Sequence, residues 1–309
     1  MSDKILLLEP VFMERIWGGT KLKELFNYNI PSNLTGEAWV ISAHKDGSSK
    51  ILNGDYKGKT LSWLYQNHKE LFNNIKDERF PLLVKLLDAQ SNLSVQVHPD
   101  DKMAVNYNDL GKTECWYVID CSKDAKIIYG HSAKSKEEFR KLIDEDAWDN
   151  LLIEKPIKPG DFVFVPAGKI HAITAGTVIL EIQQSSNVTF RLYDYNRLDD
   201  KGNPRELHIE ESIMASIIPD VEINNKSTKK IIGLNEIETL IKSDYFTVEK
   251  WNLKEKYARK NDSFILASVI NGMGKINNLD IKKGSNFIIT SDAKEFEIIG
   301  ELEIVVSYL

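Results

Sequence analysis

Four polar side chains with metal-binding chemistry stand in or beside short apolar runs. Gln96 and His98 are two residues apart, Glu114 begins a second apolar run, and His171 follows a Pro-x-Gly turn. Side chains alternate between the two faces of a strand, so Gln96 and His98 share a face with Ser94. Burying such groups without partners would cost roughly 1–3 kcal/mol each. Either a hydrogen-bond network or a bound cation must therefore satisfy them.

The ligand types indicate what a bound cation would do. One glutamine, two histidines and one glutamate supply nitrogen and oxygen ligands with a total charge of −1, so a bound Zn²⁺ would keep a positive charge and its Lewis acidity. The set contains no thiolate, which is typical of a catalytic site with a position for water or substrate. Iron, manganese, cobalt and nickel accept the same ligands, and zinc is our preferred ion. The Gln-x-His spacing taken alone equally fits a hydrogen-bonded strand edge.

Short strands are expected to position these side chains. Apolar runs separated by turn residues are typical of a β-sandwich or β-barrel, and they occur at residues 35–42, 82–89, 93–98, 114–120, 126–129, 161–166 and 178–183. Three helices are predicted between them. One begins after Thr60, one begins after Ser135 with an apolar face that extends to Trp148, and one covers residues 208–218 with Met214 on its apolar side.

The C-terminal third repeats part of this pattern. Residues 157–165 and 281–289 share the order of an apolar residue, a lysine, a turn glycine and an apolar run. The polar segment 224–230 is the predicted linker, which divides the chain into residues 1–223 and 224–309. The last of the six histidines is His208, so the second unit lacks the ligand types of the first. We therefore expect chemistry in the first unit alone.

Composition excludes several functional classes. With 28% charged residues and a formal net charge of −6, the chain has no general attraction for nucleic acid or anionic membranes. No run approaches the ~20 apolar residues of a membrane span, and the N-terminal apolar run is too short for a signal peptide. The two cysteines, Cys115 and Cys121, cannot form a multi-bridge framework. A cytoplasmic protein is expected, acting as a monomer or weak homodimer.

The spacing before His171 resembles a known motif. Gly160, five residues, Pro166-x-Gly168, two residues and His171 match the second motif of the cupin superfamily. The chain departs from that family in two places. Ala175 stands where cupins usually have asparagine, and the usual His-x-His with a nearby glutamate is replaced by Gln96-x-His98 and the distant Glu114.

This variant pattern is similar to that of the type I mannose-6-phosphate isomerase family in its short bacterial form. The resemblance covers nearly the whole sequence, including residues 16–19, 36–39, 41–44, 58–61, 80–85, 96–101, 112–114 and 184–191. It implies a mainly β fold of two cupin-type jelly-roll barrels with a few inserted α-helices. It also implies one zinc ion bound by Gln96, His98, Glu114 and His171, with Arg191 as an active-site arginine. The implied reaction interconverts mannose 6-phosphate and fructose 6-phosphate through an enediol.

Such a reaction needs a base and cations. Lys112 is two residues before Glu114, and a nearby metal would lower its pKa toward that of a useful base; an exposed turn lysine is the alternative. Glu181 is the second candidate base, with a salt bridge to Arg191 as its alternative. Arg191 can bind the phosphate or the enediolate through its planar fork, and Lys85, alone in an apolar strand, is a second cation. Ser94 completes the predicted substrate-binding set.

Two other functions fit the same residues. An Fe(II) oxygenase of the cupin superfamily would need a redox metal with two open positions, and a sugar-phosphate binding module would bind without turnover. His44, His68, His131 and His208 lack a partner at ligand spacing and are interpreted as structural or surface residues. An aldose–ketose isomerase acting on a small sugar phosphate is the preferred hypothesis.

Overall fold

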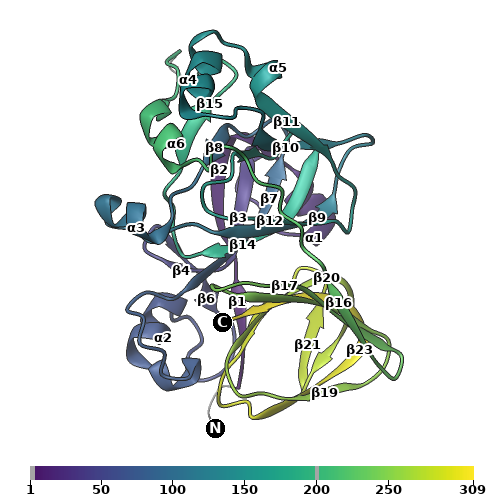
Figure 1. Cartoon of the computed structure of the whole chain (residues 1–309). Helices are drawn as coiled ribbons and strands as arrows, with labels where there is room; N and C mark the ends of the chain where they lie inside the picture. Colours follow the sequence, from purple (N-terminus) through teal and green to yellow (C-terminus); the bar gives the residue numbers. More distant parts are fainter. Residues whose placement is uncertain (1–3, 199–201) are drawn as a thin grey trace.

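The computed structural model describes residues 4–198 and 202–309, and it consists of two β-barrels joined end to end (Figure 1). The first barrel, drawn mainly in purple and teal, contains the candidate metal ligands. The second, drawn in green and yellow, contains the C-terminus. Helices are confined to connections between strands, so the predicted mainly β fold of two cupin-type barrels is confirmed.

Two antiparallel sheets form the first barrel. In hydrogen-bonded order, the six-stranded sheet contains β12 (Phe162–Val165), β9 (Glu114–Asp120), β14 (Thr177–Gln184), β7 (Leu82–Ala89), β3 (Thr35–Ile41) and β2 (Val11–Gly19). The five-stranded sheet contains β11 (Leu152–Pro156), β10 (Lys126–His131), β13 (His171–Ala172), β8 (Val95–Val97) and β15 (Phe190–Tyr193). A separate small ribbon pairs β4 (Ala43–His44) with β5 (Gly47–Ser48).

Strands β3, β7 and β14 are buried on both faces, which explains their nearly continuous apolar sequences. On β7, Leu82, Val84 and Leu86 belong to the apolar core that extends toward the second barrel. The intervening Lys85 must therefore point to the opposite face, into the first barrel. Alternation along a buried strand is thus the reason that a lone lysine enters the barrel interior.

The second barrel is one ten-stranded sheet. Its main path contains β16 (Thr228–Ile232), β17 (Asn235–Lys242), β18 (Thr247–Leu253), β23 (Glu295–Tyr308), β20 (Ile265–Ile276), β22 (Asn286–Ile289), β1 (Ile5–Glu9) and β6 (Lys50–Ile51). Beside this path, β19 (Tyr257–Lys260) pairs with β23, and β21 (Leu279–Lys282) pairs with β20. Two N-terminal strands, β1 and β6, thus hydrogen-bond into the C-terminal sheet. The division of the chain at residue 224 stays a prediction, and β16 begins within the segment predicted as the linker.

The sequence repeat is also a structural repeat. Gly160 and Gly284 adopt φ values of +90° and +87°, a region that glycine enters without steric cost. Each donates its N–H to the neighbouring strand, Gly160 to the Val118 carbonyl at 2.8 Å and Gly284 to the Val269 carbonyl at 2.9 Å. By the strand registers, the position of Glu114 is occupied in the second barrel by Ile265. The second copy therefore keeps the turn and replaces the acidic ligand with an apolar side chain.

Helices fill the connections. They are α1 (Lys21–Phe26), α2 (Leu61–Asn67), η1 (Lys69–Phe72), α3 (Asp101–Ala104), η2 (Val105–Tyr107), α4 (Lys136–Asp144), α5 (Trp148–Leu151) and α6 (Ile209–Ala215). Thr60 and Ser135 cap α2 and α4 as predicted, each accepting a backbone N–H at 3.2 Å. Two details of the helix prediction were wrong. Trp148 belongs to the separate helix α5 and not to α4, and Met214, which was predicted on the apolar side of α6, is 59% exposed. No helix among the described residues is long and apolar enough to cross a membrane.

Candidate metal centre

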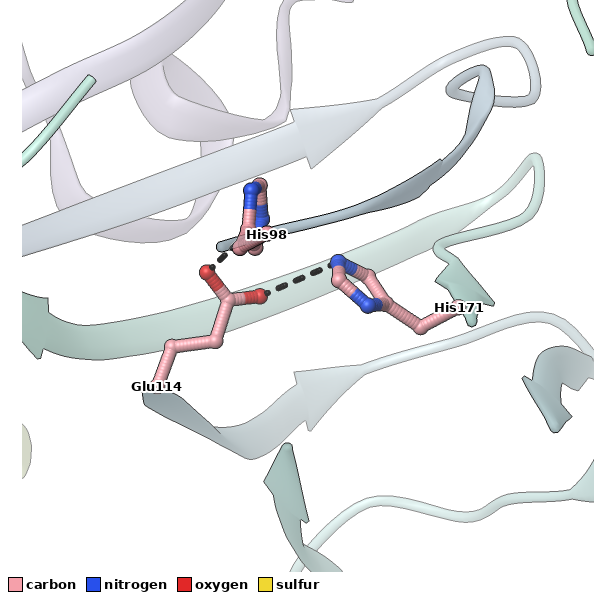
Figure 2. A group of neighbouring side chains, drawn as sticks. All are labelled: His98, Glu114 and His171. Atoms are coloured by element: carbon pink, nitrogen blue, oxygen red, sulfur yellow. Dashed lines mark ion pairs between the residues drawn. The ribbon is translucent and has the colours of Figure 1, made fainter. Parts of the chain in front are cut away.

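Three predicted ligands meet inside the first barrel. His98 follows β8, Glu114 begins β9 and His171 begins β13, and each is at most 1% exposed. The Pro-x-Gly turn before His171 is closed by Gly168, which has a φ of +85° and donates its N–H to the His98 carbonyl at 2.9 Å. The turn therefore fixes the two histidine strands relative to each other. Figure 2 shows the Glu114 carboxylate directed between the two imidazoles.

Backbone carbonyls set the orientation of both imidazole rings. His98 Nδ1 lies 2.9 Å from the Val188 carbonyl and His171 Nδ1 lies 2.8 Å from the Lys169 carbonyl. A carbonyl can only accept, so each Nδ1 carries the hydrogen and each Nε2 keeps a lone pair. These Nε2 atoms lie 3.4 and 3.5 Å from the two oxygens of Glu114, and the three ligand atoms are within 4.8 Å of one another. This arrangement is the usual form of a metal-binding histidine pair with a carboxylate.

The protonation states of these three side chains also favour the binding of a cation. Burial, followed by the nearby Lys112 ammonium, lowers the pKa of His98 to about 3, and burial lowers the pKa of His171. Burial alone would raise the pKa of Glu114, but Lys112 and the two histidines outweigh it and hold that pKa well below its usual value. Neutral imidazoles and an ionised carboxylate are the forms that ligate metals. Glu114 Oε2 is also fully buried without a well-directed hydrogen bond, so the cluster fits a metal ion.

The predicted fourth ligand is close to this cluster. Gln96 is the strand neighbour of His171 across the β8–β13 bridge, and its Nε2 lies 3.4 Å from His171 Nε2. Rotation of the terminal amide would present Oε1 in its place, because the two amide atoms are interchangeable in shape. Ser94 is 4% exposed and immediately precedes β8. Both residues lie in or beside the strand that leads to His98.

Lys112 contacts two of the three ligands. Its Nζ lies 2.8 Å from Glu114 Oε2 and 3.0 Å from His98 Nε2, and the residue is 4% exposed. The alternative of an exposed turn lysine is therefore wrong. Burial would lower the pKa of Lys112, but Glu114 and Glu181 reverse this effect, so the protein groups alone raise that pKa. The lower pKa that the sequence analysis predicts for Lys112 applies to the site with a metal ion bound, because it is the charge of that ion that would lower it.

A row of side chains crosses four neighbouring strands beside the candidate metal ligands. The registers place Trp39 opposite Lys85, Lys85 opposite Glu181 and Glu181 opposite Trp116. Glu181 Oε1 lies 3.3 Å from Lys85 Nζ, and Glu181 Oε2 accepts the Trp116 indole N–H at 3.2 Å. Its ion-pair partner is thus Lys85, and the expected alternative of Arg191 is wrong. Burial, reinforced by the charge of Glu114, raises the pKa of Glu181.

Sequence reasoning missed Glu37 and the tryptophans of this row. Glu37 is 8% exposed, accepts the Trp39 indole N–H at 2.6 Å and pairs with Arg15 at 2.7 Å. Burial would raise the pKa of Glu37, but Lys85 and Arg15 outweigh it and lower that pKa. The signal was available, because Glu37 and Trp39 share one face of the predicted strand 35–42.

Arg191 lies on β15, the edge strand of the five-stranded sheet that pairs with β8. It stands opposite Gln96 in the β8–β15 register, and its Nη1 donates to the Glu206 carbonyl at 2.7 Å. Its Nε is buried without a partner, and burial, followed by the charge of Arg205, lowers the pKa of Arg191. The neighbouring Asp194 holds Arg205 through two hydrogen bonds, at 2.5 and 2.8 Å. A cation with an unused donor therefore lies beside the predicted fourth ligand.

The remaining histidines have other partners. His131 contacts the Ile217 carbonyl through Nε2 at 3.0 Å, and His208 Nδ1 accepts the Arg191 backbone N–H at 3.2 Å. His44 packs against Trp39, and His68 packs against Tyr56 and Trp63. None of them belongs to the ligand cluster found among the described residues, in agreement with the predicted structural or surface roles.

Comparisons with known proteins identify the family and agree with the fold. Residues 5–136 match the family "Phosphomannose isomerase type I, catalytic domain", and residues 236–309 match "Mannose-6-phosphate isomerase, cupin domain". The mannose-6-phosphate isomerase ManA of Bacillus subtilis is 46% identical over the full length of both chains. The mannose-6-phosphate isomerase of Streptococcus mutans is 45% identical and covers 98% of this chain and 99% of its own.

Solved structures show the same relationship. A crystal structure of the mannose 6-phosphate isomerase from Bacillus subtilis superimposes with a TM-score of 0.97 at 44% identity, covering 99% of this chain and 100% of that one. A mutant of phosphomannose isomerase from Salmonella typhimurium, at 16% identity and a TM-score of 0.82, shares the fold. The oxygenase and binding-module alternatives are therefore set aside. The chain belongs to the type I mannose-6-phosphate isomerase family and is an enzyme that interconverts D-mannose 6-phosphate and D-fructose 6-phosphate.

Proposed function

We propose that this isomerase binds one Zn²⁺ through Gln96, His98, Glu114 and His171. The observation that carries the proposal is the convergence of two Nε2 lone pairs and a buried carboxylate within 4.8 Å, with both Nδ1 atoms hydrogen-bonded to backbone carbonyls. Nitrogen and oxygen ligands without thiolate support zinc in a catalytic role. When bound, the ion would supply Lewis acidity that stabilises negative charge on the substrate oxygens.

Two side chains near the ligands are the candidates for proton transfer. Isomerisation moves a proton between C1 and C2 of the open-chain sugar, and Lys112 and Glu181 are the candidate groups that exchange it. The raised pKa of Glu181 supports this role, because a carboxylate with a raised pKa is a stronger base at neutral pH. Lys112 is in direct contact with Glu114 and His98, which supports its role because it lies beside the proposed metal ion.

The charged end of the substrate needs cations. We assign substrate binding to Arg191, Lys85 and Ser94. The free Nε–H of Arg191 is a directed donor beside Gln96, and a guanidinium can contact two oxygens of a phosphate or an enediolate at once. Lys85 brings a second positive charge into the barrel interior, next to Glu181. Lys85, Ser94 and Glu181 are each at most 4% exposed, and the low dielectric constant of a buried environment strengthens charged interactions there.

A coupled assay of mannose 6-phosphate conversion tests the metal. We expect the wild-type enzyme to lose activity after dialysis against a chelator and to regain it with Zn²⁺. His98→Ala should lose most activity under both conditions, because its Nε2 is one of the three convergent ligand atoms. His68→Ala, which changes a histidine packed against Tyr56 and Trp63 outside the cluster, is the matched control. Undiminished turnover of both the chelated wild type and His98→Ala would contradict the metal site.

We further propose that the enzyme acts in the cytoplasm on free sugar phosphates, as a monomer or weak homodimer. The net charge of −6 supports the absence of nucleic-acid and anionic-membrane partners. Sedimentation over a range of concentrations measures the assembly. A tetramer or larger species that persists on dilution would contradict it.

A further inference from the structure

A segment of chain, here called the strap, packs against the turn that precedes His171. This strap, residues 216–221, follows α6 and runs alongside Gly168 and Lys169. Ile217 donates its N–H to the Gly168 carbonyl at 2.9 Å. Lys169 extends its side chain toward the same strap, and its Nζ lies 2.8 Å from both carboxylate oxygens of Asp220 and from the Val221 carbonyl. The Lys169 side chain is 2% exposed and that of Asp220 is 14% exposed, so the lysine end of this ion pair is buried and the carboxylate end is mostly buried.

The same two turn residues hold the metal ligands on their opposite side. The Gly168 N–H donates to the His98 carbonyl at 2.9 Å, and the Lys169 carbonyl accepts the His171 Nδ1–H at 2.8 Å. The Gly168–Lys169 segment therefore lies between the strap and both histidines. Because the Lys169 carbonyl fixes which imidazole nitrogen is protonated, its position decides where the His171 Nε2 lone pair points.

Close packing leaves this arrangement little freedom. A Cβ on Gly168 would lie 2.8 Å from Ile217 Cγ1 and 2.9 Å from the Ala215 carbonyl oxygen, and a Cβ on Gly130 would overlap the Asp220 carboxylate. Lys169 Nζ also lies 4.5 Å from the centre of the Tyr129 ring, and Tyr129 is the strand partner of His171. The Lys169 ammonium thus faces the Asp220 carboxylate, the Val221 carbonyl and the ring of Tyr129.

We propose that the buried Lys169–Asp220 ion pair is a positioning pair for the metal centre: by holding the Lys169 backbone against the strap, it sets the orientation of the His171 imidazole. The inference rests on the proposed metal-binding function of His171. Neither Lys169 nor Asp220 touches the ligand atoms themselves, and both act through the Lys169 carbonyl. Loss of a hydrogen-bond partner behind a ligand typically weakens metal affinity by about 10- to 100-fold.

Metal titrations of the full-length enzyme test the pair. Zn²⁺ affinity is measured against a chromophoric chelator, and the ligand geometry is read from the visible spectrum of the Co²⁺-substituted protein. Asp220→Asn should bind Zn²⁺ about 10- to 100-fold more weakly than wild type and should shift the Co²⁺ spectrum. Glu249→Gln is the matched control, because it changes a buried carboxylate that pairs with Arg259 at 2.9 Å in the second barrel. The control should lower stability and leave both metal readouts at wild-type values.

A double variant separates positioning from stability. Lys169→Met/Asp220→Leu removes both buried charges together and keeps apolar volume, a change that usually preserves folding. It should unfold at a denaturant concentration close to that of wild type and still bind Zn²⁺ more weakly. Wild-type affinity and a wild-type Co²⁺ spectrum in this folded variant would overturn the proposal, as would equal effects of Asp220→Asn and Glu249→Gln. A wild-type enzyme that binds no metal would instead refute the proposed metal centre.

Discussion

Replacement of Lys85 by methionine tests the charge balance inside the first barrel. Lys85 Nζ lies 3.3 Å from Glu181 Oε1, and both side chains are at most 5% exposed. At an effective dielectric constant of about 20, charges at this separation attract by roughly 5 kcal/mol. Methionine keeps much of the volume of lysine, so the variant isolates the charge. Glu181 would then be buried with one neighbouring cation fewer.

Proton uptake limits the cost of this change. Glu181 can take up a proton when Lys85 is removed, and each unit between its pKa and the solution pH costs about 1.36 kcal/mol. Taking its ordinary value of 4.5, the loss in the free energy of unfolding is at most about 4 kcal/mol at pH 7.5 and about 1.4 kcal/mol at pH 5.5. The pKa of Glu181 is already raised in the wild type, so both figures are upper limits for the contribution of Glu181 to the loss.

The sign of the pH dependence follows from the raised pKa. In the variant, the pKa of Glu181 in the folded state rises further above its unfolded value. Stability relative to wild type is therefore retained at low pH and is lost as pH rises from the wild-type pKa of Glu181 through its higher pKa in the variant. Because Lys85 is also assigned to substrate binding, KM for mannose 6-phosphate should increase.

Urea unfolding at pH 5.5 and 7.5 measures the effect, with steady-state kinetics at pH 7.5. Lys126→Met is the control, because Lys126 pairs with Glu154 at 2.6 Å on the surface, where both side chains are more than half exposed. The control should be indistinguishable from wild type at both pH values. Equal losses at pH 5.5 and 7.5 in Lys85→Met, or no loss at either, would refute the reasoning.

Two further predictions concern Arg191 and the domain division. Arg191→Lys should fold like the wild type and lose most of kcat/KM in the coupled assay, because a single ammonium cannot reproduce a two-donor fork; wild-type kinetics would rule out the assigned role. A fragment of residues 224–309 should fail to unfold cooperatively, because it lacks β1, whose Leu6 and Leu8 are at most 3% exposed, and leaves β22 with an unpaired edge. A sharp thermal transition of that fragment, followed by circular dichroism, would show that the predicted unit is independent.

The cluster of His98, Glu114 and His171 could be predicted from sequence because its signals are local. A Pro-x-Gly turn at a fixed distance from His171, the two-residue alternation of Gln96 and His98, and a lysine two residues before Glu114 each depend on a few consecutive residues. The same holds for the caps at Thr60 and Ser135 and for the turn glycines of the repeat. Local backbone geometry links each of these patterns to one structure.

Such local patterns do not predict long-range contacts. The pairing of β1 with β22 joins residues nearly 300 positions apart, and nothing near Ile5 or Asn286 in sequence indicates the partner. The choice of Lys85 and not Arg191 as the partner of Glu181 depends on the register of two strands. Register is set by which faces of the strands are buried together, and that is a property of the assembled barrel.

Sequence by itself determined the residue types, the turn geometry and the strand alternation, and hence the chemistry available to this chain. Only the tertiary structure decided which nitrogen of His98 faces Glu114, because the Val188 carbonyl that sets it lies 90 positions away in sequence. It also decided that a strap after α6 holds the His171 turn through Asp220. Hydrogen bonds between segments distant in sequence require their strands to be in place first, so the orientation of the site depends on the completed fold.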